Sequence, residues 1–310
     1  MPLVSVVIPA YNADRFVLQA VRSVLDQCYQ PIEILLVDDG STDQTAEIVR
    51  QHAPAVQVIH QENAGVAAAR NTGLRLARGD LICFLDADDG WLAGKLAAQV
   101  AYMQTHPEVG LLYHDWLVWQ PDATGSYPPL PPAPSENIGE IDNAQSGWIY
   151  HRLLLDSLVH TSTAMIRRQV MADVGLFDAQ LKLGEDYDYW LRVSRQWEIH
   201  KLKAVYSFYR AVPGSLSNLP SPKNREYLLV QNAVKQWGLA SPNGVSLTKA
   251  QLEERLAGMA FGFGYSHFYR GNPALAKQAF LDCLKHKPFH WRAICYAAAS
   301  EVRRLTGGFE

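Results

Sequence analysis

The feature that most limits the fold is an alternation of short apolar runs and helix-like patterns over the first hundred residues. Val4–Pro9 is a continuous, mostly β-branched run, which is typical of a strand buried on both faces. Three more strands are predicted at residues 33–37, 56–59 and 81–85. The helices predicted between them lie at residues 16–27, 41–52 and 65–77. The second helix opens on a capping-box pattern, Ser41–Gln44, and the short joints indicate βαβ units.

The rest of the chain is less regular. A helix at residues 92–105 and a strand at 110–119 are followed by six prolines within Pro121–Pro134, which predict a surface loop. That loop is explained equally well as a plain linker and as a cover over a substrate. Later patterns predict a strand at 161–166, a helix from about Gly184, short strands at 199–202 and 205–209, and only helices from Lys223 onward.

These patterns predict an α/β fold with two parts. We expect a Rossmann-like, mainly parallel sheet flanked by helices in residues 1–222, and an α-helical C-terminal extension in residues 223–310.

Composition and charge exclude several classes of protein. A formal net charge of −3 and a pI near 6.4 argue against nucleic-acid binding as the main task. The four cysteines form no CxxC pair, so we expect reduced thiols and neither a disulfide scaffold nor a zinc site. The first residues lack the basic start of a signal peptide, and no run approaches the ~20 apolar residues that span a bilayer. We therefore expect a cytoplasmic protein.

Polar and acidic residues follow each of the four N-terminal strands. These segments are Pro9–Asn12, Asp38–Gly40, Gln61–Gly65 and Asp86–Asp89. The carboxyl ends of parallel strands meet at one edge of a sheet, where ligands bind in such folds. An aromatic ring and five aspartates should gather there, and crowded carboxylates repel one another unless a cation joins them. The Asp-x-Asp pattern after the fourth strand suits a hard divalent ion that also binds substrate phosphates.

Each segment has a plainer explanation when taken alone. Asp38–Ser41 could be only a turn before a helix, and Asp-x-Asp is common in ordinary loops. Arg70 and Asn71 could lie on the solvated face of a helix. Four such segments in order on one sheet edge make a binding site the better interpretation. The chain has neither GxGxxG after the first strand nor GxxxxGK[ST], which argues against a dinucleotide dehydrogenase and a P-loop kinase.

Five spaced motifs resemble those of the family-2 glycosyltransferases, in the family's order, over roughly residues 1–215. They are Val4–Asn12, Leu36–Asp43, Asn63–Asn71 with Gly73, Phe84–Asp89 and Gly184–Arg192. The resemblance implies a GT-A fold, a nucleoside-diphosphate sugar donor, and transfer to an acceptor hydroxyl with inversion at the anomeric carbon. It also implies a metal-dependent enzyme of the hexosyltransferase type that uses Mn²⁺ or Mg²⁺.

The same resemblance assigns roles to individual residues. The residues that would bind the donor are Pro9, Tyr11, Asn12, Asp38, Asp39, Arg70 and Asp86. The residues that would bind the metal are Asp88, Asp86 and Asp89. Asp186 would be the general base for the acceptor hydroxyl, a role worth roughly 10²–10⁴-fold in rate. Taken alone, Asp186 could be an ordinary acid at a helix N-terminus, and Asp188 could pair with Arg192 one turn later.

One departure from the family pattern concerns the metal. Many relatives carry a histidine near the position of Val212, and residues 209–217 contain none here. Valine cannot bind a metal, so we expect either an ion held by Asp88 and phosphate alone or a low activity. We predict that His160 is structural and does not replace the missing ligand.

The helical region has two features of its own. The offsets of a single tetratricopeptide-like hairpin are matched by Gly264, Ala276, Phe280, Cys283 and Pro288. A hairpin that packs on the catalytic domain is the simpler interpretation, and partner binding is the alternative. Residues 285–304 carry five basic side chains against one acid, with Phe289, Trp291, Ile294 and Tyr296 between them. This mixture predicts either peripheral contact with the inner face of a membrane or a solvated basic face.

Three classes of function stay open on the sequence. The first is inverting sugar transfer, with a UDP-sugar favoured and a glycan or lipid-linked acceptor, in cell-surface glycan or polysaccharide synthesis. The second is a non-catalytic nucleotide- or glycan-binding relative that acts as an interaction module, which the absence of histidine at Val212 favours. The third is a nucleotidyltransferase, whose usual glycine-rich, lysine-bearing first loop does not match Pro9–Asn12.

Overall fold

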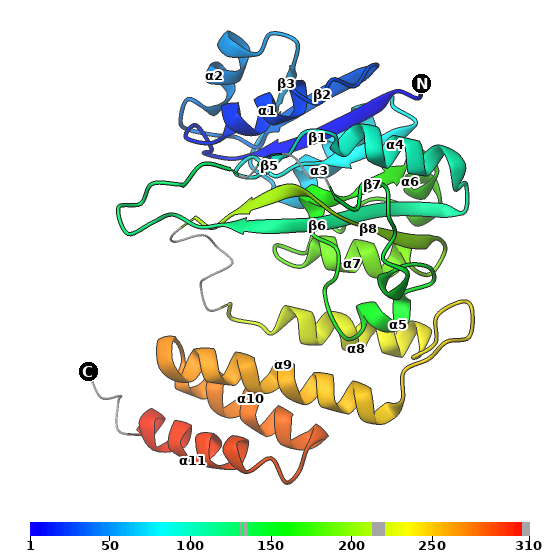
Figure 1. The fold of residues 1–310 in the computed structure, drawn as a ribbon. Helices are drawn as coiled ribbons and strands as arrows, with labels where there is room; N and C mark the ends of the chain where they lie inside the picture. The colour runs from blue at the N-terminus through cyan, green and yellow to red at the C-terminus, as the bar shows by residue number, and fades with distance from the viewer. Residues whose placement is uncertain (131, 133–135, 213–220, 306–310) are drawn as a thin grey trace. The chain divides into compact units, whose positions relative to one another are not determined.

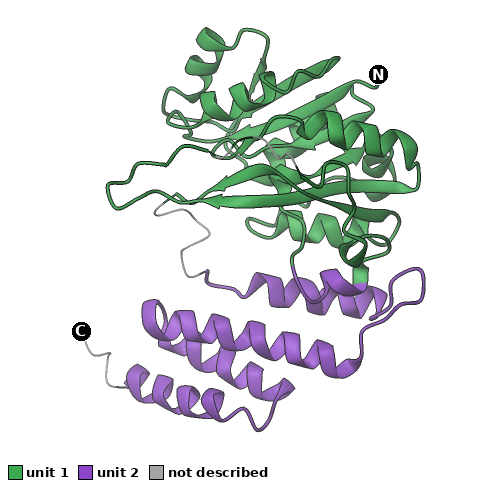
Figure 2. Cartoon of the chain, viewed as in Figure 1, with its two compact units in different colours: residues 1–150, 157–212 green, residues 151–156, 213–310 purple. Residues whose placement is uncertain are grey.

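The computed structural model describes residues 1–130, 132, 136–212 and 221–305. The chain divides into two compact units, coloured separately in Figure 2. The first contains residues 1–150 and 157–212, and the second contains residues 151–156 and 213–310. Part of the proline-rich loop and residues 213–220 lie outside the described residues.

The first unit is built on one eight-stranded sheet of order β3-β2-β1-β4-β7-β6-β8-β5 (Figure 1). Its strands are β1 (Val4–Ala10), β2 (Ile32–Asp38), β3 (Gln57–His60), β4 (Leu81–Phe84), β5 (Gly90–Trp91), β6 (Val109–Trp119), β7 (Met165–Arg167) and β8 (Glu198–Arg210). Strands β3, β2, β1 and β4 are parallel, as expected, whereas β7 is antiparallel to both β4 and β6. Strand β8 is parallel to β6, and β5 is antiparallel to β8. The sheet is therefore mixed, and β1, β2, β4, β6 and β8 all end at the same edge.

Helices cover both faces of this sheet (Figure 1). They are α1 (Val17–Leu25), α2 (Thr45–His52), α3 (Val66–Leu76), α4 (Lys95–Thr105), α6 (Arg168–Val174) and α7 (Glu185–Val193). The short helix α5 (Tyr150–Leu153) spans the boundary between the two units along the chain. Every residue of β1 is buried, in agreement with its apolar run. Helix α3 lies very close to β1, because a Cβ on Gly73 would come within 2.3 Å of the Val7 side chain. This contact fixes the helix that carries Arg70.

Three local predictions are wrong. The predicted capping box does not form, because Ser41 Oγ accepts from the Asn12 amide, and α2 begins later, at Thr45, where Asp43 accepts from the backbone amide. Residues 161–163 form a 3₁₀ turn ahead of β7 and no strand. The two short strands expected between 199 and 209 are one long strand, β8, whose pairing with β6 shifts register around Asp115.

The second unit is helical over its described residues. Its long helices are α8 (Arg225–Trp237), α9 (Lys249–Arg270), α10 (Pro273–His286) and α11 (Trp291–Leu305). A capping box of Thr248 and Gln251 opens α9. Helices α9 and α10 pack side by side, with Phe280 fully buried and its ring against Gly264. The segment 151–156 belongs here, where the His151 amide and ring each lie within 3.0 Å of Ser241 Oγ. Over the described residues, no helix combines the length and apolarity needed to cross a bilayer.

Candidate active site

The loop after β1 presents an exposed aromatic ring at the sheet edge. Tyr11 is 53% exposed, while Pro9 is buried within β1. Asn12 adopts a positive φ of 48°, and its side-chain oxygen accepts from the Thr42 amide at 2.9 Å. The first two predicted donor-binding loops are therefore joined directly to each other.

Asp38 and Asp39 are both buried at the end of β2, with 3% of each exposed. Asp38 accepts from the Ser41 amide at 3.1 Å and lies 2.8 Å from the His60 ring. Asp39 accepts from the amides of Ala64 and Gly65, both at 2.9 Å. These two carboxylates hold the loop that follows β3 against the end of β2.

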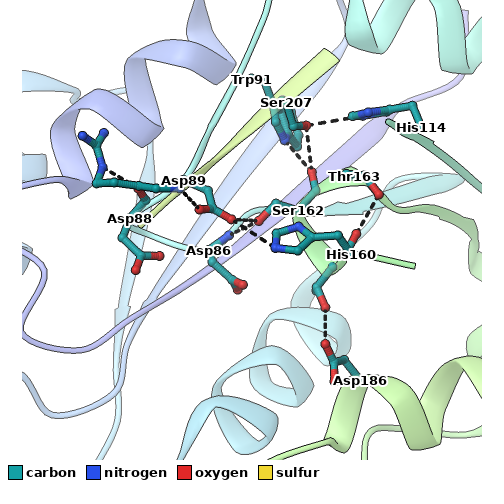
Figure 3. A network of polar contacts seen from close by, with 12 residues as sticks. Asp86, Asp88, Asp89, Trp91, His114, His160, Ser162, Thr163, Asp186 and Ser207 are labelled. Carbon is teal, nitrogen blue, oxygen red and sulfur yellow. Dashed lines mark hydrogen bonds and ion pairs between the residues drawn. The ribbon is translucent and has the colours of Figure 1, made fainter. Parts of the chain in front are cut away.

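The three acids of the Asp-x-Asp loop after β4 differ in burial and in hydrogen bonding. Asp89 is buried, and its two oxygens accept from Ser162 Oγ at 2.6 Å and from the Arg210 amide at 3.0 Å. Asp86 and Asp88 are only partly buried, and their carboxylates project from the loop in Figure 3. Burial and the nearby charge of Asp86 raise the pKa of Asp88 to about 6.

That pair of carboxylates fits a hard divalent cation. The charge of Asp86 disfavours the ionised form of Asp88, and a cation beside the two acids would remove that cost. Carboxylate oxygen is the ligand that Mg²⁺ and Mn²⁺ prefer. Among the described residues, no group of three or more His, Cys, Asp or Glu side chains is arranged to hold an ion. Val212 is half-buried and supplies no ligand.

Arg70 connects this loop to helix α7. Its guanidinium donates to Asp86 at 2.8 Å and to Glu185 at 2.6 Å, and only 3% of the residue is exposed. The guanidinium also lies over the Phe177 ring, with the guanidinium carbon 5.6 Å from the ring centroid. The plainer alternative, a solvated helix face, does not hold for either residue, because Arg70 and Asn71 are both buried and Asn71 pairs with the Phe177 backbone.

Asp186 lies in the first turn of α7, close to the Asp-x-Asp loop. Its carboxylate accepts from Thr161 Oγ1 at 3.0 Å. The next residue, Ser162, donates to Asp89 and accepts from the Asp86 amide at 3.2 Å. Two consecutive residues thus link the two acidic loops, as the dashed lines of Figure 3 trace. The loops are neighbours on one side of the sheet, as the proposed chemistry requires.

Several residues of this network were absent from the predicted site. Thr161 and Ser162 carry no motif and looked like part of a strand. Arg210 is the last residue of β8, where it donates to the Asp88 carbonyl at 2.7 Å and packs on the rings of Phe16 and Trp119. Glu185 belongs to the Glu-Asp motif, and that motif was the one sequence pattern that could have indicated its place in the site. Asp188 pairs with Arg192 at 2.9 Å, as the i,i+4 spacing predicted.

Comparison with known proteins assigns the chain to a family. The family model for glycosyl transferase family 2 matches residues 5–124. An Escherichia coli protein, UDP-Glc:alpha-D-GlcNAc-diphosphoundecaprenol beta-1,3-glucosyltransferase WfaP, is 30% identical over 242 residues, which cover 77% of this chain and 88% of WfaP. The chain belongs to glycosyltransferase family 2. Another relative, TuaG of Bacillus subtilis (strain 168), is assigned by its name to teichuronic acid biosynthesis and is 30% identical over 222 residues, 70% of this chain and 82% of TuaG.

Solved structures show that this family-2 glycosyltransferase has the GT-A fold. Staphylococcus aureus TarS 1–349 in complex with UDP-GlcNAc matches with a TM-score of 0.65 at 18% identity, covering 100% of this chain and 93% of TarS. The mannosyltransferase PcManGT from Pyrobaculum calidifontis, in complex with GDP-Man and Mn²⁺, matches with a TM-score of 0.60 at 20% identity, covering 98% and 87%. The family and the fold predicted from the sequence are both confirmed.

Proposed function

We propose that this glycosyltransferase moves a sugar from a nucleoside-diphosphate sugar to an acceptor hydroxyl with inversion, in cell-surface glycan or polysaccharide synthesis. The observation that carries the proposal is the Thr161–Ser162 link, which holds Asp186 beside the Asp-x-Asp loop. A UDP-sugar is the favoured donor, and the TarS complexes with UDP-GlcNAc and with UDP support that choice. We assign sugar transfer to the unit of residues 1–150 and 157–212, which differs from the predicted domain 1–222 at segment 151–156 and after residue 212.

The acids after β4 would hold the metal. We assign Mn²⁺ or Mg²⁺ to Asp86 and Asp88, while Asp89 keeps the loop in place because both of its oxygens accept hydrogen bonds. When bound, such an ion stabilises the negative charge of the departing diphosphate as a Lewis acid. The relative PcManGT, in complex with GDP-Man and Mn²⁺, supports the assignment.

Donor binding would use the loops after β1 and β2. The exposed ring of Tyr11 is available to pack on the nucleobase, and Asn12, Asp38 and Asp39 order the surrounding loops. The guanidinium of Arg70 is buried against Asp86 and Glu185. We therefore assign Arg70 a positioning role through Asp86 in place of direct contact with the diphosphate.

Asp186 would act as the general base. The acceptor oxygen forms its bond to the anomeric carbon as the bond from that carbon to the diphosphate oxygen breaks, and the acceptor proton passes to the Asp186 carboxylate. Helix α7 begins at Glu185, and the Tyr187 amide of its first turn donates to Asp186 Oδ1 at 2.7 Å. The Thr161 hydroxyl orients that carboxylate.

A lipid-linked acceptor is consistent with the helical unit, and we propose cytoplasmic, peripheral contact with the inner face of a membrane. Phe289 is 95% and Trp291 is 70% exposed. The cations of this region are mostly paired, since Lys285 binds Asp282 and Lys287 binds Glu254. The exposed aromatic side chains therefore support the proposal better than charge does. WfaP, whose name gives an acceptor on diphosphoundecaprenol, supports it as well.

A non-catalytic, nucleotide-binding relative is the second candidate, because residues 209–217 lack the usual histidine. Two assays distinguish an active transferase from a non-catalytic relative. The first is a thermal-shift screen of UDP-, GDP- and dTDP-sugars with and without Mn²⁺, and the second measures donor hydrolysis. A donor at about 100 times its Kd should stabilise the protein by about 3 kcal/mol. We expect Mn²⁺-dependent hydrolysis that is lost in Asp88→Asn and Asp186→Asn and kept in Asp26→Asn, an exposed control. If Asp88→Asn and Asp186→Asn both match the wild type, the enzymatic assignment is wrong.

A further inference from the structure

Three partly exposed rings stand at the same sheet edge as the proposed catalytic residues. Strands β6 and β8 run parallel and pair Trp116 with Ser207, two residues before Tyr209. Strand β7 is antiparallel to both β4 and β6, so the residues just ahead of it lie where β4 and β6 end. His160 is one of those residues. The topology thus brings together Trp116, His160 and Tyr209 from three separate parts of the chain.

The rings contact one another in an ordered way. His160 stacks on Trp116, with centroids 5.2 Å apart and planes 28° from parallel. Tyr209 meets His160 edge to face, with centroids 5.4 Å apart. All three residues keep part of their surface exposed, and the His160 side chain is 22% exposed. The three rings are therefore in contact and form one aromatic cluster.

This cluster lies directly beside the proposed base. His160 is followed by Thr161, which donates to Asp186, and its Nε2 lies 3.9 Å from Asp89. Figure 3 shows the His160 ring between the Asp-x-Asp loop and Asp186. A group that packs on the rings would therefore have its hydroxyls within reach of the general base.

A second aromatic cluster in the same unit serves as a comparison. Trp119, three residues along β6, is 8% exposed and packs with Phe208, Tyr127 and the guanidinium of Arg210. That cluster is a small hydrophobic core of its own. Among the residues that the structure describes, Trp116 lacks this coverage and is only half-buried, so its exposed surface is open to a ligand there.

We propose that Trp116, supported by His160 and Tyr209, is the platform on which the acceptor's reacting sugar packs. This inference rests on the proposed function and narrows its acceptor to one that ends in a pyranose. The C–H face of a pyranose is apolar and packs well on an aromatic ring, while its rim hydroxyls stay free to bond with polar groups such as Asp186. A bare lipid alcohol or an amino-acid hydroxyl would gain nothing comparable from the platform.

The test compares transfer with donor hydrolysis in Trp116→Ala and Trp116→Phe. The donor is the nucleotide sugar that stabilises the wild type, and the acceptors are aryl pyranosides of glucose, galactose, mannose and their N-acetyl forms. Val118→Ala, on the same strand and 52% exposed, is the matched control. We expect Trp116→Ala to raise the acceptor KM at least tenfold, with donor KM and donor hydrolysis within twofold of the wild type. Trp116→Phe should keep most of the acceptor affinity.

The other outcomes overturn the inference. An unchanged acceptor KM in Trp116→Ala would show that the ring does not bind acceptor. A parallel loss of donor hydrolysis in both Trp116 variants would make Trp116 a structural residue. A wild type that hydrolyses donor but glycosylates no pyranoside would refute the pyranose acceptor alone. A wild type that binds no donor would refute the proposed function, and the platform with it.

Discussion

The Arg70 guanidinium lies 2.6 Å from the Glu185 carboxylate, although 115 residues separate them in the chain. The other terminal nitrogen of Arg70 holds Asp86 at 2.8 Å. Burial alone would lower the pKa of Arg70, but the charges of Asp86 and Glu185 raise it, so the guanidinium stays charged. One side chain therefore fixes the start of helix α7 against the Asp-x-Asp loop.

Removing this cation should destabilise the protein strongly. Arg70→Met leaves Glu185 buried with no counter-charge, and such a loss costs about 3–5 kcal/mol. Arg70→Lys should also be destabilising, because an ammonium cannot bond two carboxylates in a planar fork. Urea unfolding measures both. The control is Arg75→Met, at an exposed position of the same helix, which should change the unfolding free energy by less than about 0.5 kcal/mol. A change as small in Arg70→Met would contradict the role given to Arg70.

Two acids of the first turn of α7 should differ sharply in function. We expect Asp186→Asn to lower kcat by roughly 10²–10⁴-fold, because the amide cannot take the acceptor proton. Asp188→Asn removes only a partly exposed pair with Arg192, so kcat should stay within about threefold and stability within about 1 kcal/mol. Steady-state kinetics with calorimetric donor binding measure the contrast. Equal losses in the two variants would argue against Asp186 as the base.

Lys95 should give the folding stability a distinct pH dependence. Its ammonium is fully buried over the Trp91 ring, near Cys83 and His114, and burial lowers the pKa of Lys95 to about 8. Between about pH 8 and the usual value of 10.5, the unfolded chain holds a proton that the folded chain has lost. Stability therefore rises with pH through that window.

The matched variant is Lys95→Met, which should abolish this rise. From pH 8 to 9.5 the free energy of unfolding of the wild type should gain about 2 kcal/mol relative to the variant. Urea unfolding at several pH values checks the slope, and Lys182→Met, at an exposed position, should behave like the wild type. Identical slopes for wild type and Lys95→Met would show that the buried amine does not titrate there.

Membrane contact should depend on the tip between α10 and α11. Replacing Phe289 and Trp291 with serine should lower partitioning onto phosphatidylglycerol vesicles at least tenfold, because each large side chain contributes about 2 kcal/mol when buried in lipid. Val245→Ser, 49% exposed in the same unit, is the control. Co-sedimentation provides the measurement. Binding that survives the double substitution, or that the wild type lacks, would rule out this surface.

The parallel half of the sheet could be predicted closely from the sequence. Strands β1 and β4 are buried along their whole length, so their apolar runs mark them almost to the residue. The candidate binding residues that directly follow such strands could be located from the sequence because the ends of the strands were clear. Errors came where side chains serve distant partners: Ser41 bonds to Asn12 in place of capping its own helix, and Ser162 bonds to Asp89.

The other half of the sheet, and the contacts made by distant residues, could not be predicted from local sequence patterns. The prediction divided strand β8 at residues 203–204, because Lys201 and Leu202 are both buried and interrupt the alternation that marks a strand. The partners of Arg70 lie 16 and 115 residues away, and no local pattern encodes such a pairing. Tyr296 was counted among the aromatic side chains of a surface that either contacts a membrane or is a solvated basic face, but its ring packs against Phe268 and Phe280 in the helical unit.

The position of segment 151–156 in the helical unit has a consequence for biosynthesis. The ribosome releases His151 about 90 residues before Ser241, the residue that binds its amide and ring. The helical unit therefore cannot reach its final structure as an independent C-terminal module, because one of its pieces emerges with the catalytic sheet. Expression of residues 213–310 alone would leave Ser241 without that histidine.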